Sequence, residues 1–476
     1  MDVRLTLYDP HTIQIQTEDM DYYDMMCDEF TRYVEGFRFV PAYKTGNWNG
    51  KICMIQEYKR TFPYGILMDY IRVHKDHFPR NPLKIDPEVI ALFRGPKLNI
   101  EYNLALYPRP YQQDCIEAAL LHTKGIIRSA TASGKSLVIG YIIKTLLENG
   151  VIEKAIIIVP SLSLITQFHE DLLEYGFKNE NIGQVHAGSK QWDKGIVIST
   201  WQSLTKESNR LEGFGAIIVD ETHGAKAHEL KKTLSQAKGA QYRLGFTGTM
   251  PINKLDHWNT KAFLGPIIRE YSSGLLAEQG YISKCTVNML NIKYFEEFDG
   301  EYNDVRDAVF KNKFRQNLIG ALTSKLDHNV LLLVDKVEKE GEMLQRFLKK
   351  KTNKTIIFLS GRDKVEVREE WRKRCMKEDN IILIATYGIF QQGINIPNLK
   401  YVILAAPFKA KIRILQSIGR ALRVHANKEA GAKIYDIVDK TKFFNKYGKL
   451  RLRYYDSEKF EVKEYQFSES SNKFDF

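Results

Sequence analysis

Cysteine is scarce in this chain, and its few thiols are scattered. The 476 residues hold five cysteines, an odd number, and no two are spaced as Cys-x-x-Cys. This pattern suits neither a disulfide framework nor a zinc site. We therefore expect reduced, buried thiols and no structural metal. The cysteines are Cys27, Cys53, Cys115, Cys285 and Cys375.

The chain also lacks long apolar runs. No stretch approaches the roughly 20 apolar residues that a membrane-spanning helix needs. The first residues, Met1-Asp2-Val3-Arg4, lack the basic start and apolar centre of a secretory signal. We therefore expect a soluble, cytoplasmic protein that binds no membrane. At 476 residues the chain is too long for a single hydrophobic core, so we expect about two to four domains.

Acidic residues are in the minority, and the formal net charge is +12. The imbalance is uneven: residues 1–40 carry three basic and nine acidic side chains, whereas residues 401–476 carry sixteen and nine. A basic excess away from the amino terminus suits a polyanionic partner such as nucleic acid. A solubilising surface would have the same composition, so charge alone does not decide between them.

The pattern of apolar residues changes along the chain. Residues 1–105 show strands and turns with little helical periodicity, which indicates a small α+β domain. Beyond Pro110, short apolar strands alternate with helical stretches, as in a parallel sheet covered on both faces. We predict an α/β protein with two such sheets in tandem. The expected strands are near 126–130, 155–159, 196–199, 216–219 and 243–247, then 330–334, 355–359, 381–385, 401–404 and 433–437.

A phosphate-binding loop is predicted between the first expected strand and the helix after it. Strand, loop and helix are the context that a P-loop requires. The backbone N–H groups and the helix amino terminus would face the phosphates of ATP, and Lys135 would reach the β- and γ-phosphates. The strict pattern has glycine at position 129, where this chain has Ser129, so a simple glycine turn is the alternative. The predicted loop residues are Thr131, Ala132, Ser133, Gly134, Lys135 and Ser136.

An acidic pair follows the expected strand at 216–219. Asp220 would emerge at the carboxyl end of this strand and hold Mg²⁺ together with the Ser136 hydroxyl. Glu221 is the candidate to orient or deprotonate the attacking water. The order of the loop and the acidic pair therefore predicts hydrolysis of ATP with Mg²⁺.

Other polar turns follow the expected strands or begin a helix. Arg109, Tyr111 and Gln112 precede the P-loop, where the Gln112 amide offers a donor and an acceptor to an adenine edge. Turns after three further strands would hold phosphodiester oxygens without reading bases. Turns of this kind also serve as ordinary helix N-caps. The predicted nucleic-acid contacts here are Pro160, Ser161, Thr200, Trp201 and Thr386.

The second expected sheet has no Walker lysine but carries a basic helix. Gln416, Arg420 and Arg423 share one helical face at spacings of four and three. Arginines placed this way can enter the nucleotide site and stabilise transition-state charge, an effect worth roughly 10³–10⁵ in rate. A solvated basic face is the alternative. Gly393 precedes this helix and is a further candidate for nucleotide binding.

Together these motifs resemble the DExH type of superfamily 2 helicases over about 108–440. The amino-terminal segments 36–39, 43–51 and 63–65 resemble UvsW-type recombination helicases of T-even phages. The motifs are Tyr111-Gln112, Gly134-Lys135-Ser136, Asp220-Glu221-Thr222-His223, Thr247-Gly248-Thr249, Thr386…Gly393 and Gln416…Gly419-Arg420…Arg423. The resemblance implies two RecA-like domains, at 106–275 (ATP and Mg²⁺) and 276–440 (arginine fingers), with an amino-terminal DNA-engaging domain at 1–105 and a packed basic and aromatic extension at 441–476.

The resemblance also implies an activity. It implies ATP-driven unwinding and branch migration of forks, displacement loops and Holliday junctions in recombination, repair and replication, by a phage protein in the host cytoplasm. We expect a monomer, with recombination or single-strand-binding proteins as further partners. Lys51 and Trp48 are the predicted amino-terminal DNA contacts, although Trp48 is equally suited to that domain's core.

Three positions depart from the family pattern, and other activities are compatible with the motifs. Ala132 stands where glycine is usual, Asn395 where aspartate is frequent, and Ser417 where arginine is common. We expect activity to survive, because the lysine, both acids and both arginines are present. The alternatives are a double-stranded DNA translocase, an RNA-directed helicase and, from another class, a nucleic-acid clamp that does not hydrolyse ATP.

Overall fold

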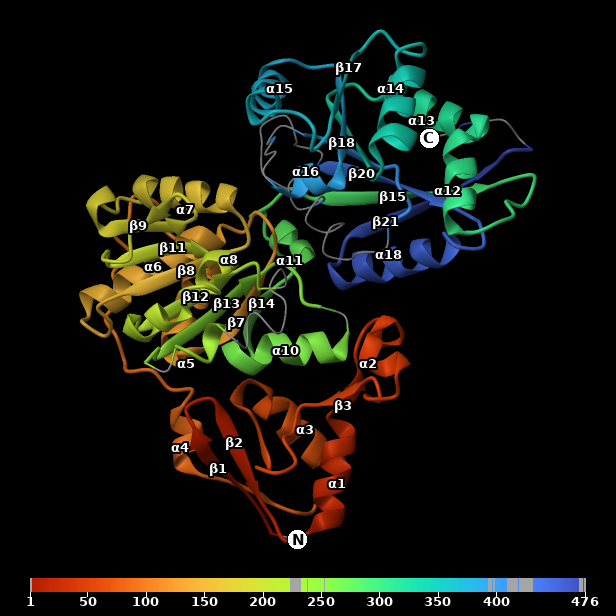
Figure 1. Ribbon diagram of the computed structural model, residues 1–476. Coiled ribbons are helices and arrows are strands. Elements are labelled where there is room, and N and C mark those ends of the chain that lie inside the picture. Colours follow the sequence, from red (N-terminus) through yellow and green to blue (C-terminus); the bar gives the residue numbers. More distant parts are fainter. Residues whose placement is uncertain are drawn as a thin grey trace. The chain divides into compact units, whose positions relative to one another are not determined.

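The computed structural model describes residues 2–222, 233–237, 239–251, 253–392, 396, 399–408, 418, 431–470 and 474. Contacts divide the chain into two compact units (Figure 1). The first comprises 1–129 and 134–270, and the second comprises 130–133 and 271–476. In these described stretches, no helix has the length and apolar character of a bilayer span.

The first unit begins with a small α+β layer. Its strands are β1 (Val3–Asp9), β2 (Thr12–Gln16), β5 (Thr61–Pro63) and β6 (Leu83–Ile85), in the order β5-β2-β1-β6, and a hairpin of β3 (Thr31–Tyr33) with β4 (Lys51–Cys53). Its helices are α1 (Met20–Glu29), α2 (Pro41–Lys44), α3 (Leu67–His77) and α4 (Pro87–Ala91), with short 3₁₀ turns η1 (Phe37–Phe39) and η2 (Tyr64–Ile66).

Helices α1 and α3 contradict the expectation that residues 1–105 have little helical periodicity. Helices α1 and α3 span 10 and 11 residues. The Asp19 carboxylate caps α1 by accepting the Tyr22 N–H at 2.9 Å. The buried residues of α1 are two tyrosines and a methionine among acidic residues, so an apolar periodicity was hard to recognise. Amphipathic tyrosines therefore supply the core-facing stripe of α1.

An eight-stranded sheet forms the rest of the first unit, in the order β10-β9-β11-β8-β12-β13-β7-β14. The strands are β7 (Lys124–Ser129), β8 (Ala155–Val159), β9 (Ile182–His186), β10 (Ser189–Lys190), β11 (Ile196–Thr200), β12 (Ala216–Asp220), β13 (Tyr242–Thr247) and β14 (Ile267–Tyr271). The helices are α5 (Pro110–His122), α6 (Lys135–Glu148), α7 (Leu162–Glu174), α8 (Trp201–Leu204) and α10 (Lys254–Leu264). All five strands expected here are present, and their pairings with one another are parallel.

The second unit holds a seven-stranded sheet in the order β17-β18-β16-β19-β20-β15-β21, with parallel pairing throughout. Its strands are β15 (Cys285–Lys293), β16 (Val330–Val334), β17 (Thr355–Leu359), β18 (Ile381–Thr386), β19 (Tyr401–Leu404), β20 (Ala432–Asp439) and β21 (Glu461–Ser468). Its helices include α11 (Ser273–Glu278), α12 (Tyr302–Lys311), α13 (Lys313–Lys325), α14 (Met343–Leu348), α15 (Val365–Lys377), α16 (Tyr387–Gln392) and α18 (Asn445–Ser457). The α/β fold class with two parallel-sheet domains is confirmed.

The carboxyl-terminal segment packs on the second sheet. Strand β21 adds to the edge beside β15, and Tyr455 on α18 is buried. Arg451, also on α18 and buried, donates to the Asp436 carboxylate at 2.8 Å. The Tyr455 hydroxyl donates to the same carboxylate. This arrangement corresponds to a packed extension and leaves the Tyr455 ring unavailable for stacking on bases.

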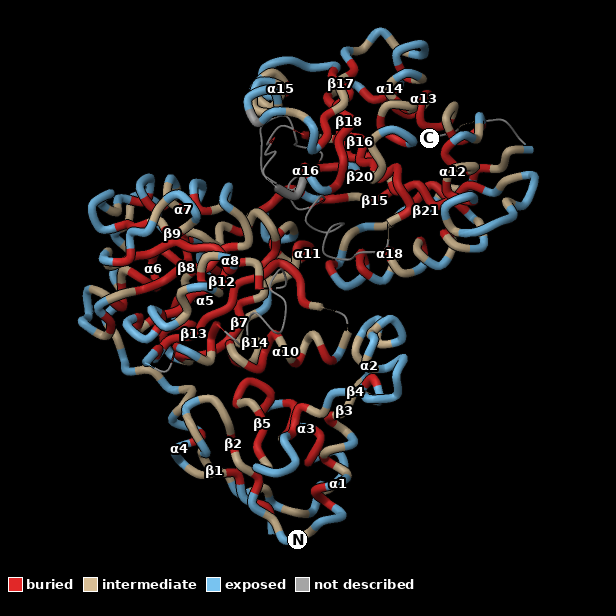
Figure 2. Tube along the Cα trace, in the orientation of Figure 1, coloured by how far each residue is buried: buried red, intermediate tan, exposed pale blue. Residues whose placement is uncertain are grey.

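The strands of both large sheets are largely buried, as Figure 2 shows. In the first unit the amino-terminal layer shares its hydrophobic core with α10. Trp258 on α10 stacks on Phe30 with 4.9 Å between ring centroids. Lys261 Nζ forms a buried ion pair with Asp69 Oδ2 at 2.5 Å. A Cβ at Gly65 would lie 1.7 Å from the Lys261 carbonyl oxygen, so this crossing requires glycine.

The Lys261–Asp69 pair generates a stability prediction. Asp69→Asn alone leaves the buried Lys261 ammonium without its partner and should cost about 3–5 kcal/mol, whereas Lys261→Met should cost less, because Asp69 keeps Arg72 at 3.2 Å. The double variant should cost less than the sum of the two single variants, because no unpaired charge remains. Urea unfolding of the full chain, followed by tryptophan fluorescence, measures both quantities.

The exposed Lys144–Glu148 pair on α6 is the control. Its removal should cost less than about 0.5 kcal/mol. Equal costs for the buried and the exposed pair would show that the ion pair does not hold the amino-terminal layer to α10.

Candidate functional site

The predicted phosphate loop is the turn between β7 and α6. Strand β7 ends at Ser129 and α6 begins at Lys135, with Gly134 as its N-cap at φ +73°. Gly134 makes no side-chain cap, and its carbonyl oxygen accepts the Leu137 N–H at 3.1 Å. A helix amino terminus of this kind favours an anion.

Gln112 fixes the conformation of this loop from the neighbouring helix. Its Oε1 accepts the Arg109 N–H at 2.8 Å, at the start of α5. Its Nε2 donates to the Gly134 carbonyl oxygen at 3.4 Å. A Cβ on Gly134 would lie 2.6 Å from this nitrogen. In this structure the Gln112 amide therefore joins α5 to the loop. To bind an adenine edge, the amide would have to give up the Arg109 N–H and the Gly134 carbonyl oxygen. The neighbouring Tyr111 is buried.

Ala132 adopts a conformation that an L-residue rarely takes. Its φ is +70°, in the left-handed region. This is the position where related loops usually have glycine, so the departure from the family pattern carries backbone strain of about 1–2 kcal/mol. Ser133, next in the loop, is buried.

Lys135 and Ser136 begin α6 at the end of the loop. Lys135 Nζ donates to the Ser129 carbonyl oxygen at 3.4 Å. The Ser136 hydroxyl lies 2.8 Å from the hydroxyl of Tyr175. Sequence reasoning missed Tyr175, because it follows α7, about forty residues away in sequence, with no local motif around it. A hydroxyl can both donate and accept, so Ser136 can keep this contact and still offer a lone pair to a cation.

Asp220 and Glu221 leave the sheet at the end of β12. Burial, and to a lesser extent the Glu221 charge, raise the pKa of Asp220 to about 7, and Lys135 opposes this shift. Among the described residues, no donor reaches the buried Asp220 Oδ1. Glu221 has φ +49°, a second strained position. A buried, acceptor-only oxygen fits a hard divalent cation such as Mg²⁺, so Asp220 and Ser136 are suitable ligands for this ion.

The strand register places the loop and the acids at one edge of the sheet. Asp220 pairs in register with Phe246 on β13, and Thr247 pairs with Arg128 on β7. Strand β13 therefore separates the loop from Asp220. Thr247 is buried, and its hydroxyl donates to the Thr249 carbonyl oxygen at 2.7 Å. In parallel sheets, ligands bind outside this carboxyl edge.

The turns predicted to contact nucleic acid lie along the same edge. Thr200 on β11 pairs with Val159 on β8, so Trp201 and Pro160 follow neighbouring strand ends. The Thr200 hydroxyl lies 3.1 Å from that of Ser203, and Ser161 bonds Ser163 in the same way. These hydroxyls sit at the N-caps of α8 and α7.

The Trp201 ring corrects part of that prediction. It is 2% exposed and belongs to the hydrophobic core of the first sheet. The ring therefore cannot stack on a base, and only the backbone of Trp201 remains for a phosphate contact. In the second unit, Thr386 is buried at the carboxyl end of β18.

The amino-terminal candidates lie around the start of β4: Trp48 precedes the strand, and Lys51 is its first residue. Trp48 is half-buried, outside the core of its layer, and its Nε1 donates to the Lys51 carbonyl oxygen at 2.9 Å. Lys51 Nζ lies 5.0 Å from the centre of the Tyr33 ring. The remaining candidates, Gly393, Gln416, Arg420 and Arg423, lie outside the described residues, as do His223, Asn395, Ser417 and Gly419.

Comparisons with known proteins match three segments of the chain to families. Residues 2–78 match the family described as DNA helicase UvsW, N-terminal; 105–252 match type III restriction enzyme, res subunit; and 311–425 match helicase conserved C-terminal domain. The chain is 28% identical to the ATP-dependent DNA helicase uvsW of Enterobacteria phage T4 over 92% of this chain and 91% of the relative.

Two further similarities extend over most of the chain. The DNA 3'-5' translocase XPB2 of Sulfurisphaera tokodaii is 25% identical over 86% of this chain and 97% of the relative. The crystal structure of T4 UvsW aligns with a TM-score of 0.50 and 25% identity, covering 98% of this chain and all of that one. The resemblance to superfamily 2 helicases, and to UvsW among them, is confirmed.

The strain at Ala132 leads to a testable change. Ala132→Gly should remove the left-handed strain and raise the free energy of unfolding by about 0.5–1 kcal/mol, net of the greater chain entropy of glycine. Thermal unfolding of the ligand-free chain measures this difference.

Ala130→Gly in the same loop is the matched control, because Ala130 is buried and is not among the left-handed residues. This change should lower stability. A loss of stability with Ala132→Gly as well would mean that the loop does not carry the strain.

Proposed function

The chain is an ATP-hydrolysing helicase of superfamily 2 that resembles UvsW, and from this premise we propose that it unwinds and branch-migrates branched DNA. The substrates would be forks, displacement loops and Holliday junctions. The observation that carries the proposal is similarity to the phage helicase over 92% of the chain, with a separate match of residues 2–78 to the UvsW amino-terminal family. The catalytic motifs alone are common to helicases with many substrates.

We propose that the carboxyl edge of the first sheet hydrolyses ATP. The N–H groups at the start of α6 would bind the phosphates, with Lys135 at the β- and γ-phosphates. Mg²⁺, which neutralises developing phosphate charge when bound, would be held by Ser136 and Asp220. Glu221 would orient the attacking water and accept its proton. Asp220 Oδ1, which no donor among the described residues reaches, and the amino terminus of α6 support these roles.

The second domain would complete the reaction with Arg420 and Arg423. Their roles, and those of Gln416 and Gly393, come from the resemblance, which includes a helicase carboxyl-terminal domain at residues 311–425. Guanidinium groups at the γ-phosphate would stabilise the transition state and would lose this contact after hydrolysis. This loss would couple the chemistry to a change between two conformations.

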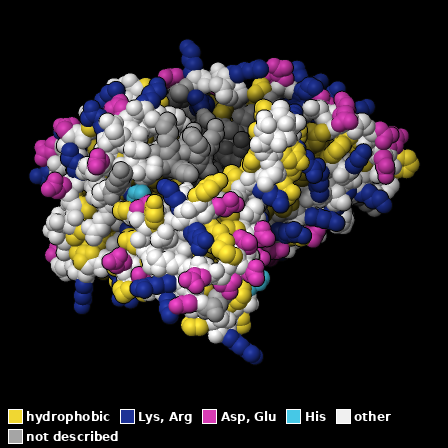
Figure 3. Space-filling model, turned by 60° about the horizontal axis from the view of Figure 1, so that its bottom comes forward, with side chains coloured by type: hydrophobic (Ala, Val, Ile, Leu, Met, Phe, Trp, Pro, Cys, Tyr) yellow, Lys and Arg dark blue, Asp and Glu magenta, His cyan; other side chains and the backbone are white. Residues whose placement is uncertain are grey.

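DNA would be gripped mainly through its phosphates. The proposed contacts are the Ser161 and Thr200 hydroxyls, the backbone at Pro160 and Trp201, and Thr386. Contacts of this kind are tolerant of sequence and sensitive to salt. The net charge of +12 would attract the polyanion. On the face that Figure 3 presents, basic side chains are interspersed with acidic and hydrophobic ones.

The hairpin of β3 and β4, residues 31–53, is the proposed amino-terminal DNA contact. Phe39 and Tyr33 are 82% and 51% exposed, unusual values for aromatic side chains. Phe37 stacks on Tyr33 at 4.6 Å, and Arg38 lies 5.7 Å from the centre of the Phe37 ring. Exposed aromatics interleaved with cations are suited to unpaired bases at a branch point.

A double-stranded DNA translocase is the second candidate function. The observation that favours it is the similarity to a relative whose name is DNA 3'-5' translocase, over 97% of that relative. An RNA-directed helicase and a clamp that does not hydrolyse ATP are weaker candidates. The clamp would have no use for the acidic pair Asp220 and Glu221.

We further propose that the protein acts as a monomer in the cytoplasm of an infected bacterium. The phage origin of the relative supports this setting. Recombination proteins or single-strand-binding proteins would be present on the same DNA intermediates.

Forked, displacement-loop, Holliday-junction and linear DNA, with a forked RNA, distinguish these candidates. We expect ATPase stimulation and strand separation to be greatest with branched DNA. Glu221→Gln should lower the ATPase rate at least about 100-fold and leave DNA binding intact, because the substitution removes the base but keeps the shape. Absence of stimulation by every DNA would contradict the proposal, and movement on linear duplex without strand separation would favour the translocase.

The hairpin has its own test in the salt dependence of binding. If Lys44 and Lys51 contact phosphates, the variant Lys44→Ala/Lys51→Ala should reduce the slope of log affinity against log salt by about 1.8 on duplex DNA. Lys75→Ala/Arg80→Ala, which removes two exposed cations elsewhere in the same layer, is the matched control. Equal slopes for the two double variants would remove the hairpin from the DNA contact surface.

A further inference from the structure

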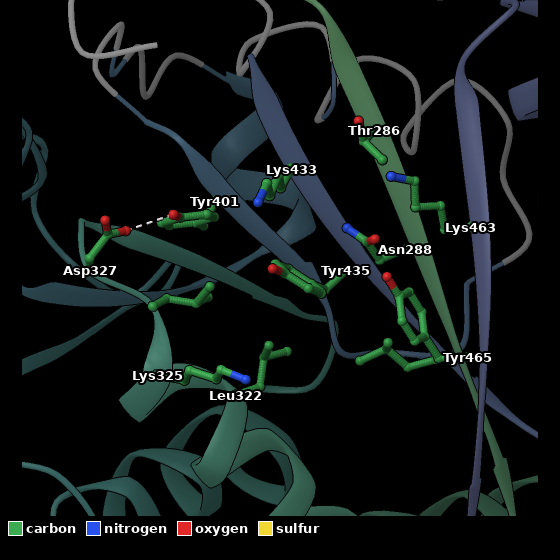
Figure 4. Close-up of a pocket in the computed structure, with 12 residues that line it drawn as sticks. Thr286, Asn288, Leu322, Lys325, Asp327, Tyr401, Lys433, Tyr435, Lys463 and Tyr465 are labelled. Carbon is green, nitrogen blue, oxygen red and sulfur yellow. Dashed lines mark hydrogen bonds between the residues drawn. The ribbon is translucent and has the colours of Figure 1, made fainter. Parts of the chain in front are cut away.

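A polar pocket lies in the second unit, outside every motif described above. It has a volume of about 460 Å³. Its walls come from β15, β19, β20, β21 and the end of α13 (Figure 4). The lining residues are Thr286, Asn288, Leu290, Leu322, Lys325, Leu326, Asp327, Tyr401, Lys433, Tyr435, Lys463 and Tyr465.

The pocket lies at the amino edge of its sheet. Tyr401 begins β19, Lys433 is the second residue of β20, and Thr286 is the second of β15. These strands pair in parallel through β16 with β18, which ends at Thr386. Thr386, the proposed DNA contact in this unit, therefore lies at the opposite, carboxyl edge of the same sheet. The pocket is not part of the ATP chemistry or of the phosphate contacts proposed above.

Cations dominate the charged groups of the pocket. Three lysines face one acid, Asp327, among the lining residues. The Tyr401 hydroxyl donates to Asp327 at 2.6 Å, and Lys400 lies within 3.9 Å of the same carboxylate, so its charge is already partly compensated. Lys463 Nζ is paired with Glu461 at 3.1 Å, whereas among the described residues no carboxylate lies within ion-pair distance of Lys433. An anion entering the pocket would meet a net positive charge.

Aromatic rings form the floor between these lysines. Tyr401 and Tyr435 lie with 6.5 Å between ring centroids, and Tyr465 is on the adjacent edge strand. In Figure 4, Tyr435 lies between Lys433 above and Lys325 below. The rings of Tyr435 and Tyr465 are only half-buried, so part of each is open to a ligand. Burial raises the pKa of Tyr435 to about 12, so the ring stays neutral near an anion.

We infer that this pocket binds one nucleotide. Its volume is within the range of about 300–1,000 Å³ typical of small-ligand sites. A planar base can stack on the tyrosines while the phosphate contacts Lys433 and Lys463, and the amide of Asn288 can contact a base edge. A phosphate ion alone would make no stacking contact with the tyrosine rings. An apolar ligand would desolvate the three lysine ammonium groups without offering them hydrogen-bond acceptors.

A nucleotide is available to this pocket from two sources. The nucleotide is either free in solution or an unpaired nucleotide of a nucleic-acid strand. The second source rests on the proposed function, since it requires single-stranded DNA near the enzyme, whereas the first does not. A strand held at the amino edge would give the enzyme a hold on its substrate in addition to Thr386, which lies at the carboxyl edge of the same sheet.

Lysine footprinting tests the inference in the full chain. The chain carries Lys135→Ala, so that nucleotide binding at the P-loop is weakened, and is acetylated with and without dTMP or a short oligothymidylate. Mass spectrometry then reports the reactivity of each lysine. We expect acetylation of Lys433 and Lys463 to fall about tenfold at saturating probe. Lys350 and Lys377, which are exposed elsewhere in the same unit, should change less than about twofold.

The outcomes separate the two sources. Protection by dTMP identifies a free nucleotide as sufficient, and protection by the oligothymidylate alone identifies a strand. Lack of protection by both probes, or equal protection of Lys350 and Lys377, overturns the inference. Failure of forked DNA to stimulate the ATPase would overturn the proposed function without changing protection by dTMP.

A matched pair of variants provides a second readout. Lys433→Ala/Lys463→Ala should weaken binding of whichever probe protects by about tenfold, and Lys350→Ala/Lys377→Ala, with the same loss of charge, should not. Both should keep the unstimulated ATPase rate, because none of these lysines is at the proposed ATP site. Equal affinity of the two double variants would also overturn the inference.

Discussion

The parallel register of the first sheet is the constraint on which the candidate site depends. Because β7, β13, β12, β8 and β11 all run in one direction, their carboxyl ends share one edge. Segments from five separate parts of the chain are thereby brought together: the phosphate loop, Thr247, the acidic pair, and the turns after Val159 and Thr200. A slip of one residue in β12 would turn Asp220 to the other face of the sheet.

Local strain and unsatisfied polarity both occur at this edge. Ala132 and Glu221 have positive φ values, and Asp220 buries an oxygen without a donor from the described residues. Each feature costs stability, and the strongly apolar strands around them offset that cost. Such conflicts are expected where the ligand, not the protein, supplies the missing partner. The raised pKa of Asp220 has the same origin, because a buried carboxylate without a cation is disfavoured.

The sequence predicted the strands that are continuously apolar and missed those that are not. All ten expected strands are present, because buried parallel strands show as uninterrupted runs. Strand β15 was missed because Asn288 and Asn291 interrupt it, and β21 because charged residues alternate along an edge. Helices α1 and α3 were missed because tyrosines and charged residues obscure the apolar period.

The phosphate loop and the acidic pair were predicted because they are linear motifs. The contact of Tyr175 and the structural role of Gln112 depend on residues that are distant in sequence. The burial of Trp201 depends on packing.

The most direct measurement is a structure of the full chain with Mg²⁺, a non-hydrolysable ATP analogue and forked DNA. The account predicts phosphates on the N–H groups at the start of α6, and Mg²⁺ between Ser136 Oγ and Asp220 Oδ1. It also predicts DNA phosphates along the turns after β8 and β11. Nucleotide bound elsewhere, or DNA that avoids this carboxyl edge, would contradict it.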